Sequence, residues 1–300
     1  IDYLEKQRDL YKYIHDQTMR LANKGFNKEE IAEQIELPSA LGQEFSNRDY
    51  YGTVNHNSRA VYVKYLGYFD GNPATLHPLP RAKSSKKYVA YMGGIEAMYR
   101  MALEDFNKGE YRWVAELLNH AVSVDPDHQA SRSLLADTYE QLGYQSESAP
   151  WRNFYLCGAK ELRHGIPAGS LYSASEGTLR GMPLDNLFKA MAVRLIPSKV
   201  EGLDLAINLN FTDLTDQFRL EIRNSVFHGF RNFAEKEAAT ELVLSSINFK
   251  RMMSGLITVG ELIKSDDMQI KGDAKPLLPL PSYFDSFQRR FPLVIPQPFE

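Results

Sequence analysis

The stretch Tyr65-Leu66-Gly67-Tyr68-Phe69-Asp70-Gly71-Asn72-Pro73 decides how the first part of the chain folds. An aromatic, apolar run, predicted as a helix from about Val54 to Tyr68, passes here into an Asp-Gly-Asn-Pro turn. In such a turn the Asp and Asn side chains bond to nearby backbone, and Gly71 tolerates a positive φ. We therefore expect the turn to fix the exit of the helix that carries Tyr68. His56 lies near the start of the same helix.

Helical periodicity continues on both sides of this stretch. Residues 2–24 repeat apolar side chains at three- and four-residue steps, and Asn27 with Glu30 predicts a capping box for a second helix. Residues 84–164 predict four helices, the first running from Val89 to Ala102, paired as in a short tetratricopeptide-like (TPR-like) array. Such pairs bury little surface alone, so they favour packing on another domain or on a second subunit.

The hydrophobic period changes beyond a glycine-rich boundary at residues 165–182. Residues 203–211 alternate apolar and polar side chains, which predicts a half-buried strand. Further short strands and helices are expected after it, including a helix at the end of residues 276–287. The proline-rich tail from Phe291 is predicted to be extended. Strands grouped with helices at both ends predict an α+β domain.

Length, charge and cysteine content narrow the function classes. Three hundred residues suggest about two domains. A net charge of −3 favours neither a nucleic acid nor an anionic membrane as partner, and no apolar run approaches the ~20 residues of a membrane span. The lone Cys157 cannot form an internal disulfide. We expect it to be a small buried apolar side chain rather than a nucleophile.

Two more motifs accompany the opening stretch. Together with Tyr111-Arg112-Trp113-Val114-Ala115 and Pro150-Trp151-Arg152-Asn153-Phe154-Tyr155-Leu156, it resembles the zinc-dependent alkylsulfatases. These are of the linear primary-alkylsulfatase (dodecyl sulfate hydrolase) type and belong to the metallo-β-lactamase superfamily. The resemblance covers nearly the whole chain. It implies three parts: a helical tail of the catalytic region with a linker (1–82), an all-α TPR-like dimerisation domain (83–168) and an α+β sterol-carrier-protein-2-like (SCP2-like) domain (169–300).

The resemblance also implies a reaction and partners. A full-length family enzyme hydrolyses long-chain primary alkyl sulfates, such as dodecyl sulfate, to alcohol and sulfate, using zinc-bound water, and it forms a homodimer. The family's zinc ligands belong to a His-x-His-x-Asp-His motif and to later Glu and His residues. All of them lie upstream of the region that this chain resembles. None of the seven histidines here forms His-x-His or His-Glu-x-x-His. We assign no catalytic residue and no metal ligand, and we expect this chain alone to be inactive and to need an N-terminal zinc domain.

His56 and Tyr68 are the candidate substrate-binding residues. The resemblance places them at the sulfate-contacting wall of the active site, where an imidazole and a phenol donate hydrogen bonds to sulfate oxygens. Without the resemblance, a lone helical His and a Tyr are ordinary structural residues. Their twelve-residue separation gives about 120° around an ideal helix, so periodicity alone does not pair them. Arg59 has either an acidic neighbour or a ligand as its partner, and the sequence leaves both open.

Apolar side chains leave two questions open. Trp113 and Trp151 occupy matching places in the helical array, and core packing is favoured over a ligand role, with a subunit interface compatible with both. In the second half, a methionine- and aromatic-rich set forms either an ordinary core or a tunnel for an alkyl chain. Its members are Leu187, Phe188, Met191, Phe211, Phe249, Met252, Met253, Leu256 and Ile257.

The alternative function is non-catalytic. The chain would then be a dimeric module that binds a lipid or a surfactant, built from the helical and carrier-like parts alone. The reading frame upstream of Ile1 separates the two hypotheses, because an in-frame His-x-His-x-Asp-His segment supports the enzyme. The compartment is not given by the sequence, and a periplasmic or secreted location would require an upstream signal peptide.

Overall fold

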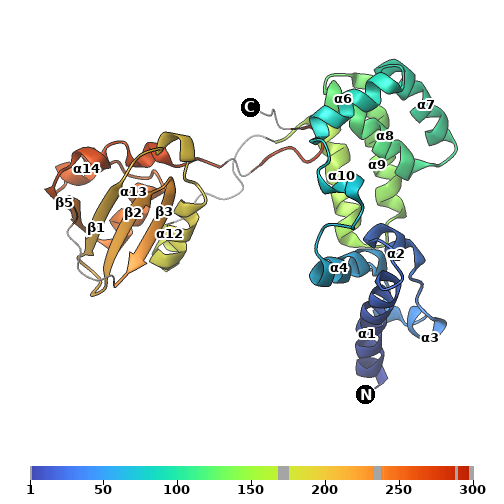
Figure 1. Cartoon of the computed structure of the whole chain (residues 1–300), viewed down its shortest axis with the longest axis horizontal. Helices are drawn as coiled ribbons and strands as arrows, with labels where there is room; N and C mark the ends of the chain where they lie inside the picture. Colours follow the sequence, from blue (N-terminus) through green and yellow to red (C-terminus); the bar gives the residue numbers. More distant parts are fainter. Residues whose placement is uncertain (1, 168–175, 233–237, 239, 288–289, 297–300) are drawn as a thin grey trace. The chain divides into compact units, whose positions relative to one another are not determined.

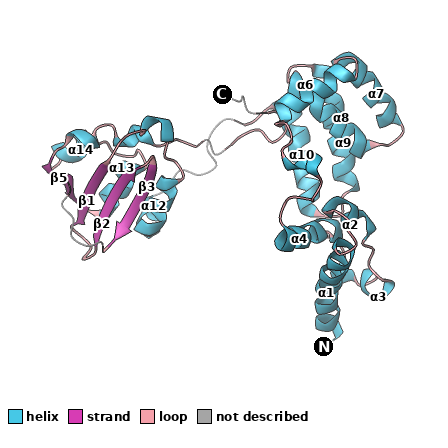
Figure 2. Ribbon diagram, in the orientation of Figure 1, coloured by secondary structure: helices cyan, strands magenta, loops and turns pink. Residues whose placement is uncertain are grey.

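The computed structural model describes residues 2–167, 176–232, 238, 240–287 and 290–296, and it divides into two units. A helical unit takes in Ile1–Pro167 together with the tail Phe291–Glu300, and a sheet unit takes in Ala168–Arg290. Figures 1 and 2 show the helices of the first unit and the single five-stranded sheet of the second. The α+β fold class is thereby confirmed. The finer boundary between residues 1–82 and 83–168 stays a prediction.

The helical unit begins with a small bundle. Leu21, Ile31, Ile35 and Tyr62 form its buried core. The predicted capping box is confirmed, since the Asn27 side chain accepts from the Glu30 backbone N–H and the Glu30 carboxylate accepts from the Asn27 N–H. The elements are α1 (Asp2–Ala22), α2 (Lys28–Gln34), α3 (Ser39–Gly42), a 3₁₀ turn (Phe45–Asn47), α4 (Val54–Leu66) and α5 (Pro73–Leu76).

Residues 81–164 form five helices rather than the four predicted. The predicted first helix, from Val89 to Ala102, is wrong because Gly93 and Gly94 both adopt positive φ, 86° and 98°, and split it into two. Met98, Leu118 and Leu135 are fully buried in the shared core. The helices are α6 (Arg81–Tyr91), α7 (Ile95–Asn107), α8 (Tyr111–Val124), α9 (Gln129–Gln145) and α10 (Ala149–His164).

The chain's tail returns to this helical core. The Glu161 carboxylate on α10, only 6% exposed, accepts hydrogen bonds from the backbone N–H groups of Leu293, Val294 and Ile295 at 2.6, 3.0 and 2.9 Å. Arg81 on α6 donates to the Val294 carbonyl at 2.7 Å, and the Val294 side chain is buried in the same core. A buried charge is tolerated here because backbone donors surround it.

The sheet unit is built on the strand order β3-β2-β1-β4-β5. β1 pairs with β4 in parallel, and the other neighbours are antiparallel. The predicted strand alternation is confirmed, because β1 buries every second residue. The strands are β1 (Leu205–Phe211), β2 (Gln217–Arg223), β3 (Val226–Arg231), β4 (Thr240–Leu244) and β5 (Met268–Gly272).

Helices pack on the apolar face of this sheet. Phe188 contacts the rings of Phe218 and Phe249, and it lies directly over Gly229 on β3. The helix expected at the end of residues 276–287 is wrong, because prolines leave only two 3₁₀ turns there, Lys275–Leu277 and Leu280–Tyr283. The helices are α11 (Glu176–Gly181), α12 (Leu184–Ala192), α13 (Ser246–Met253) and α14 (Val259–Lys264), with a 3₁₀ turn at Pro197–Lys199.

The described helices include none with the length and apolar character that a bilayer crossing requires.

Candidate functional site

The first turn of α4 positions His56. The Thr53 hydroxyl caps the helix by accepting from the His56 backbone N–H at 2.8 Å. The imidazole is exposed, and its edge faces Trp151 of α10 with ring centroids 6.3 Å apart. The Trp151 ring therefore limits the imidazole on one side, while the exposed part of the ring remains available to a ligand.

The other end of α4 carries the turn that opened the sequence. Gly67 ends the helix with φ of 82°, and Gly71 follows with φ of 85°. Asp70 Oδ1 accepts from the Asn72 N–H, and Asn72 Oδ1 accepts from the Ala74 N–H, both at 3.0 Å. The predicted local backbone bonding of this turn is confirmed, and it leads directly into α5.

Tyr68 lies between the helix end and the turn. Its side chain is 78% exposed. Its backbone carbonyl accepts a hydrogen bond from Nζ of Lys28, the first residue of α2, at 3.4 Å. Among the described residues, no hydrogen bond or ring contact joins His56 to Tyr68. The helix expected to run to Tyr68 ends at Leu66, so His56 lies in the first turn of α4 and Tyr68 just beyond its last turn. Both side chains are exposed, and their shared role in substrate binding stays a prediction.

Sequence reasoning missed a charged cluster formed by Glu33 of α2 and Arg112 of α8. Glu33 of α2 accepts from both terminal nitrogens of Arg112 on α8, at 3.0 and 3.1 Å, and from Asn55 Nδ2 at 3.2 Å. The pKa of Glu33 lies below its ordinary value, chiefly because Arg112 donates to its carboxylate. Arg59 makes no ion pair in the described helical unit, and its buried Nε has no hydrogen-bond partner. No short-range sequence signal links Glu33 to Arg112, which are 79 residues apart.

A hydrolytic zinc site takes about three protein ligands, and two of the histidines here already have other partners. His15 binds Asp16 and Tyr65, and His128 binds Glu96 and Ser131. In the described residues, no three His, Cys, Asp or Glu side chains gather as a metal site would require. The described residues therefore do not fit a zinc centre.

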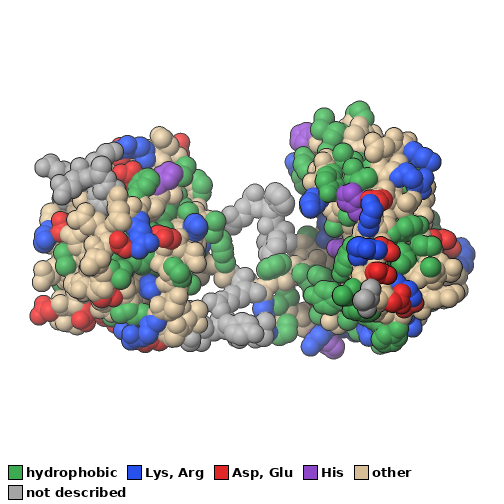
Figure 3. Space-filling view, turned by 90° about the horizontal axis from the view of Figure 1, so that it is seen from below, with side chains coloured by type: hydrophobic (Ala, Val, Ile, Leu, Met, Phe, Trp, Pro, Cys, Tyr) green, Lys and Arg blue, Asp and Glu red, His purple; other side chains and the backbone are tan. Residues whose placement is uncertain are grey.

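Two predictions about single side chains are wrong. Cys157 is exposed rather than buried, because its place on α10 faces away from the helical core. Trp113 is 47% exposed, which contradicts core packing, while a ligand role and a subunit interface both stay predictions. Trp151 is half-buried against His56. Figure 3 shows apolar side chains gathered on one face of the helical unit.

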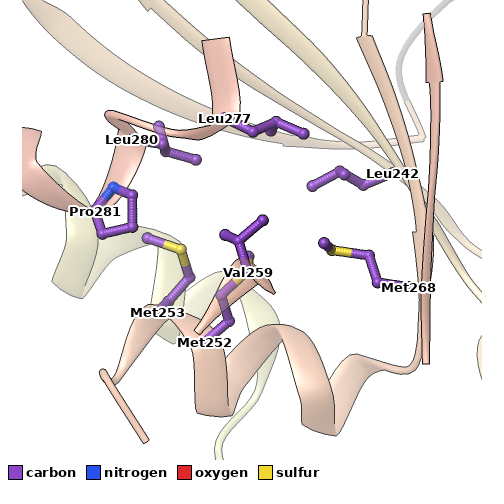
Figure 4. A pocket seen from close by; sticks show the side chains of 8 residues that line it. All are labelled: Leu242, Met252, Met253, Val259, Met268, Leu277, Leu280 and Pro281. Carbon is purple, nitrogen blue, oxygen red and sulfur yellow. The ribbon is translucent and has the colours of Figure 1, made fainter. Parts of the chain in front are cut away.

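The sheet unit contains a narrow apolar pocket. Figure 4 shows side chains from β4, β5, α13, α14 and the two 3₁₀ turns Lys275–Leu277 and Leu280–Tyr283 pointing toward one another, and the space between them is too small to admit a water molecule. Most of the apolar set predicted as core or tunnel is buried, while Leu256 is exposed and Ile257 is partly buried. The pocket is lined by Leu242, Met252, Met253, Val259, Met268, Leu277, Leu280 and Pro281.

Comparison with known proteins gives these features a family. The protein-family model for the alkyl sulfatase dimerisation domain matches residues 27–165. The family model for the alkyl sulfatase C-terminal domain matches residues 172–296. The chain belongs to the alkylsulfatase family. The region that holds His56, Tyr68 and the charged cluster thus lies within the family's dimerisation domain.

Individual alkylsulfatases match over nearly the whole chain. A linear primary-alkylsulfatase from Pseudomonas sp. is 45% identical over 98% of this chain and 44% of its own length. An alkyl/aryl-sulfatase from Saccharomyces cerevisiae is 41% identical over 98% of this chain and 45% of its own length. The solved structure of the stereoselective inverting sec-alkylsulfatase Pisa1 from Pseudomonas sp. superposes with a TM-score of 0.91 at 37% identity, over 98% of this chain and 46% of that one. The chain therefore spans less than half the length of these relatives.

Proposed function

We propose that this chain supplies the dimer contact and part of the substrate-binding surface of an alkylsulfatase that hydrolyses long-chain primary alkyl sulfates to alcohol and sulfate. The observation that carries the proposal is the 45% identity to a linear primary-alkylsulfatase, maintained over 98% of the chain. The zinc ligands are assigned to a domain outside this sequence. His56 and Tyr68 contribute hydrogen-bond donors that hold the sulfate group, and apolar surface of the chain holds the alkyl group.

Both candidate residues have the chemistry that this role needs. The His56 imidazole and the Tyr68 hydroxyl are exposed, and the helix cap and the Asp-Gly-Asn-Pro turn fix the backbone on either side of them. Donors placed in advance stabilise the charge on sulfate oxygens without further reorganisation. A protonated imidazole adds a charge-assisted bond of about twice the neutral strength.

The double variant His56→Gln/Tyr68→Phe is expected to bind octyl sulfate at least about tenfold more weakly than the unaltered chain, because two donors to an anionic group are weakened or lost. Isothermal titration with octyl sulfate below its micelle concentration measures the change. Binding of octyl glucoside, which has no sulfate, should not change.

The matched control is His77→Gln/Tyr91→Phe, which makes the same substitutions at two exposed positions elsewhere in the helical unit. Equal weakening in the control pair, or undiminished octyl sulfate binding in the His56/Tyr68 pair, would remove these residues from the proposed site.

We propose that the active form is a homodimer formed through the helical unit. The match to a dimerisation domain supports this, and the exposed indole of Trp113 has the character of an interface residue.

Trp113→Asp is expected to raise the dimer dissociation constant at least about tenfold, as measured by sedimentation velocity. Phe287→Asp, at an exposed aromatic in the sheet unit, serves as control. A monomeric unaltered chain would refute the homodimer, and a dimer insensitive to Trp113→Asp would place its interface elsewhere.

A further inference from the structure

Arg59 is a cation whose partner is missing from the helical unit that the structure describes. It lies on α4 three residues after His56, and side chains at that spacing are neighbours on one helix face. Its Nε is buried and has no hydrogen-bond partner. A buried donor without an acceptor is unfavourable, so this position calls for an acceptor that the described residues do not supply.

The carboxylate close enough to interact electrostatically with Arg59 is already engaged. Arg59 contributes to lowering the pKa of Glu33, but its contribution is smaller than the hydrogen bonds from Arg112. Arg112 occupies both oxygens of Glu33, and Asn55 donates to one of them. Because Glu33 bonds to Arg112, Arg59 has no direct ion pair among the described residues of the helical unit and meets Glu33 only through a weaker electrostatic interaction.

We propose that Arg59 is a further sulfate-binding residue, which receives the sulfate group of an alkyl sulfate together with His56. This inference rests on the function proposed above. A guanidinium group presents paired N–H donors that match two oxygens of a tetrahedral oxyanion. The imidazole of His56, one helical turn away, contributes another donor, so one sulfate group meets two donors from a single rigid element.

Arg112 then has an indirect role in the same site. Because it holds the Glu33 carboxylate, it keeps that carboxylate from pairing with Arg59. Removal of Arg112 releases Glu33 to compete with sulfate for Arg59, whereas removal of the Glu33 charge leaves Arg59 free. An anion site at Arg59 therefore predicts that removing Arg112 weakens sulfate binding, whereas removing the charge of Glu33 does not.

The alternative to a sulfate site is that Arg59 and Asn55 share a purely structural partner. Asn55 Oδ1, one turn before Arg59 on α4, is also buried without a partner. A water molecule held between Asn55 and Arg59 would satisfy both groups, and sulfate affinity would then be independent of Arg59.

The 300-residue chain is titrated with inorganic sulfate and with octyl sulfate. Binding is measured by calorimetry and by the NMR shift of the indole N–H of Trp151, whose ring faces His56. Arg59→Gln is expected to raise the sulfate dissociation constant about tenfold, and Arg59→Lys less, since charge is kept but the planar fork is lost. Arg112→Gln is expected to raise it about threefold, and Glu33→Gln to leave it unchanged or lower it. Arg100→Gln, at an exposed unpaired arginine on α7, should have no effect.

Each outcome decides between the proposals. Sulfate binding that His56→Gln weakens but Arg59→Gln leaves intact would overturn the role of Arg59 and keep the proposed function. Binding that neither variant alters, or the absence of any sulfate-dependent shift at Trp151, would overturn both. Unchanged thermal unfolding of the variants excludes loss of folding as the cause.

Discussion

Replacing Glu161 with alanine is expected to detach the chain's tail from the helical unit. The carboxylate holds the backbone N–H groups of Leu293, Val294 and Ile295, and hydrogen bonds to a charged acceptor contribute about 1.5–3 kcal/mol each. The three bonds share one carboxylate, so their contributions are not additive. We therefore expect a net loss of about 3 kcal/mol in the free energy that keeps the tail docked.

Hydrogen exchange at these three amides measures the loss, since about 3 kcal/mol corresponds to roughly hundredfold faster exchange by local opening. Glu104→Gln, at an exposed carboxylate on α7 without a hydrogen-bond partner, should stay within about 0.5 kcal/mol of the unaltered chain. Protection of the tail amides that survives Glu161→Ala would show that Val294 packing and Arg81 hold the tail without the carboxylate.

Replacing Gly229 with alanine is expected to destabilise the sheet unit by about 1–3 kcal/mol, because the core must accommodate an extra methyl group. A Cβ at position 229 would lie 2.5–2.7 Å from three Phe188 atoms, Cγ, Cδ2 and Cβ. Phe188 is itself fixed by edge-on contacts with Phe218 and Phe249, so it has little freedom to move. Chemical denaturation followed by exchange of the strand amides measures the change.

The matched control is Gly260→Ala. Gly260 lies in α14, and nothing surrounds the position of an added Cβ within 4 Å, so alanine should be neutral or stabilising by up to about 1 kcal/mol. A second variant, Gly229→Ala with Phe188→Leu, should recover part of the loss, which appears as a coupling energy between the two sites. Strict additivity of the two changes would contradict a clash with Phe188.

Local sequence signals predicted the elements they directly control. The capping box at Asn27 and the backbone bonds of Asp70 and Asn72 are satisfied within a few residues, so composition and spacing suffice for them. The strand alternation of residues 205–211 was equally clear. The Gly93–Gly94 break was missed because the apolar period runs through it, and only the positive φ of both glycines interrupts the helix.

Long-range contacts could not be predicted from such signals. Glu161 and the tail are more than 130 residues apart in sequence, and nothing around Glu161 marks it as buried. The charged cluster has the same character, since Glu33 meets Arg112 only because α2 and α8 belong to one unit. For His56 and Tyr68 the sequence supplied the residues through a family resemblance, and the structure supplied their exposure and their fixed backbone.

The central claim is that this chain binds alkyl sulfates but does not contain the ligands for the metal centre that cleaves them. The most direct measurement is sulfate release from octyl sulfate and dodecyl sulfate by the 300-residue chain, with and without added zinc. The account predicts no release above the protein-free rate under either condition, together with His56-dependent binding of octyl sulfate. Zinc-dependent turnover by this polypeptide would contradict it.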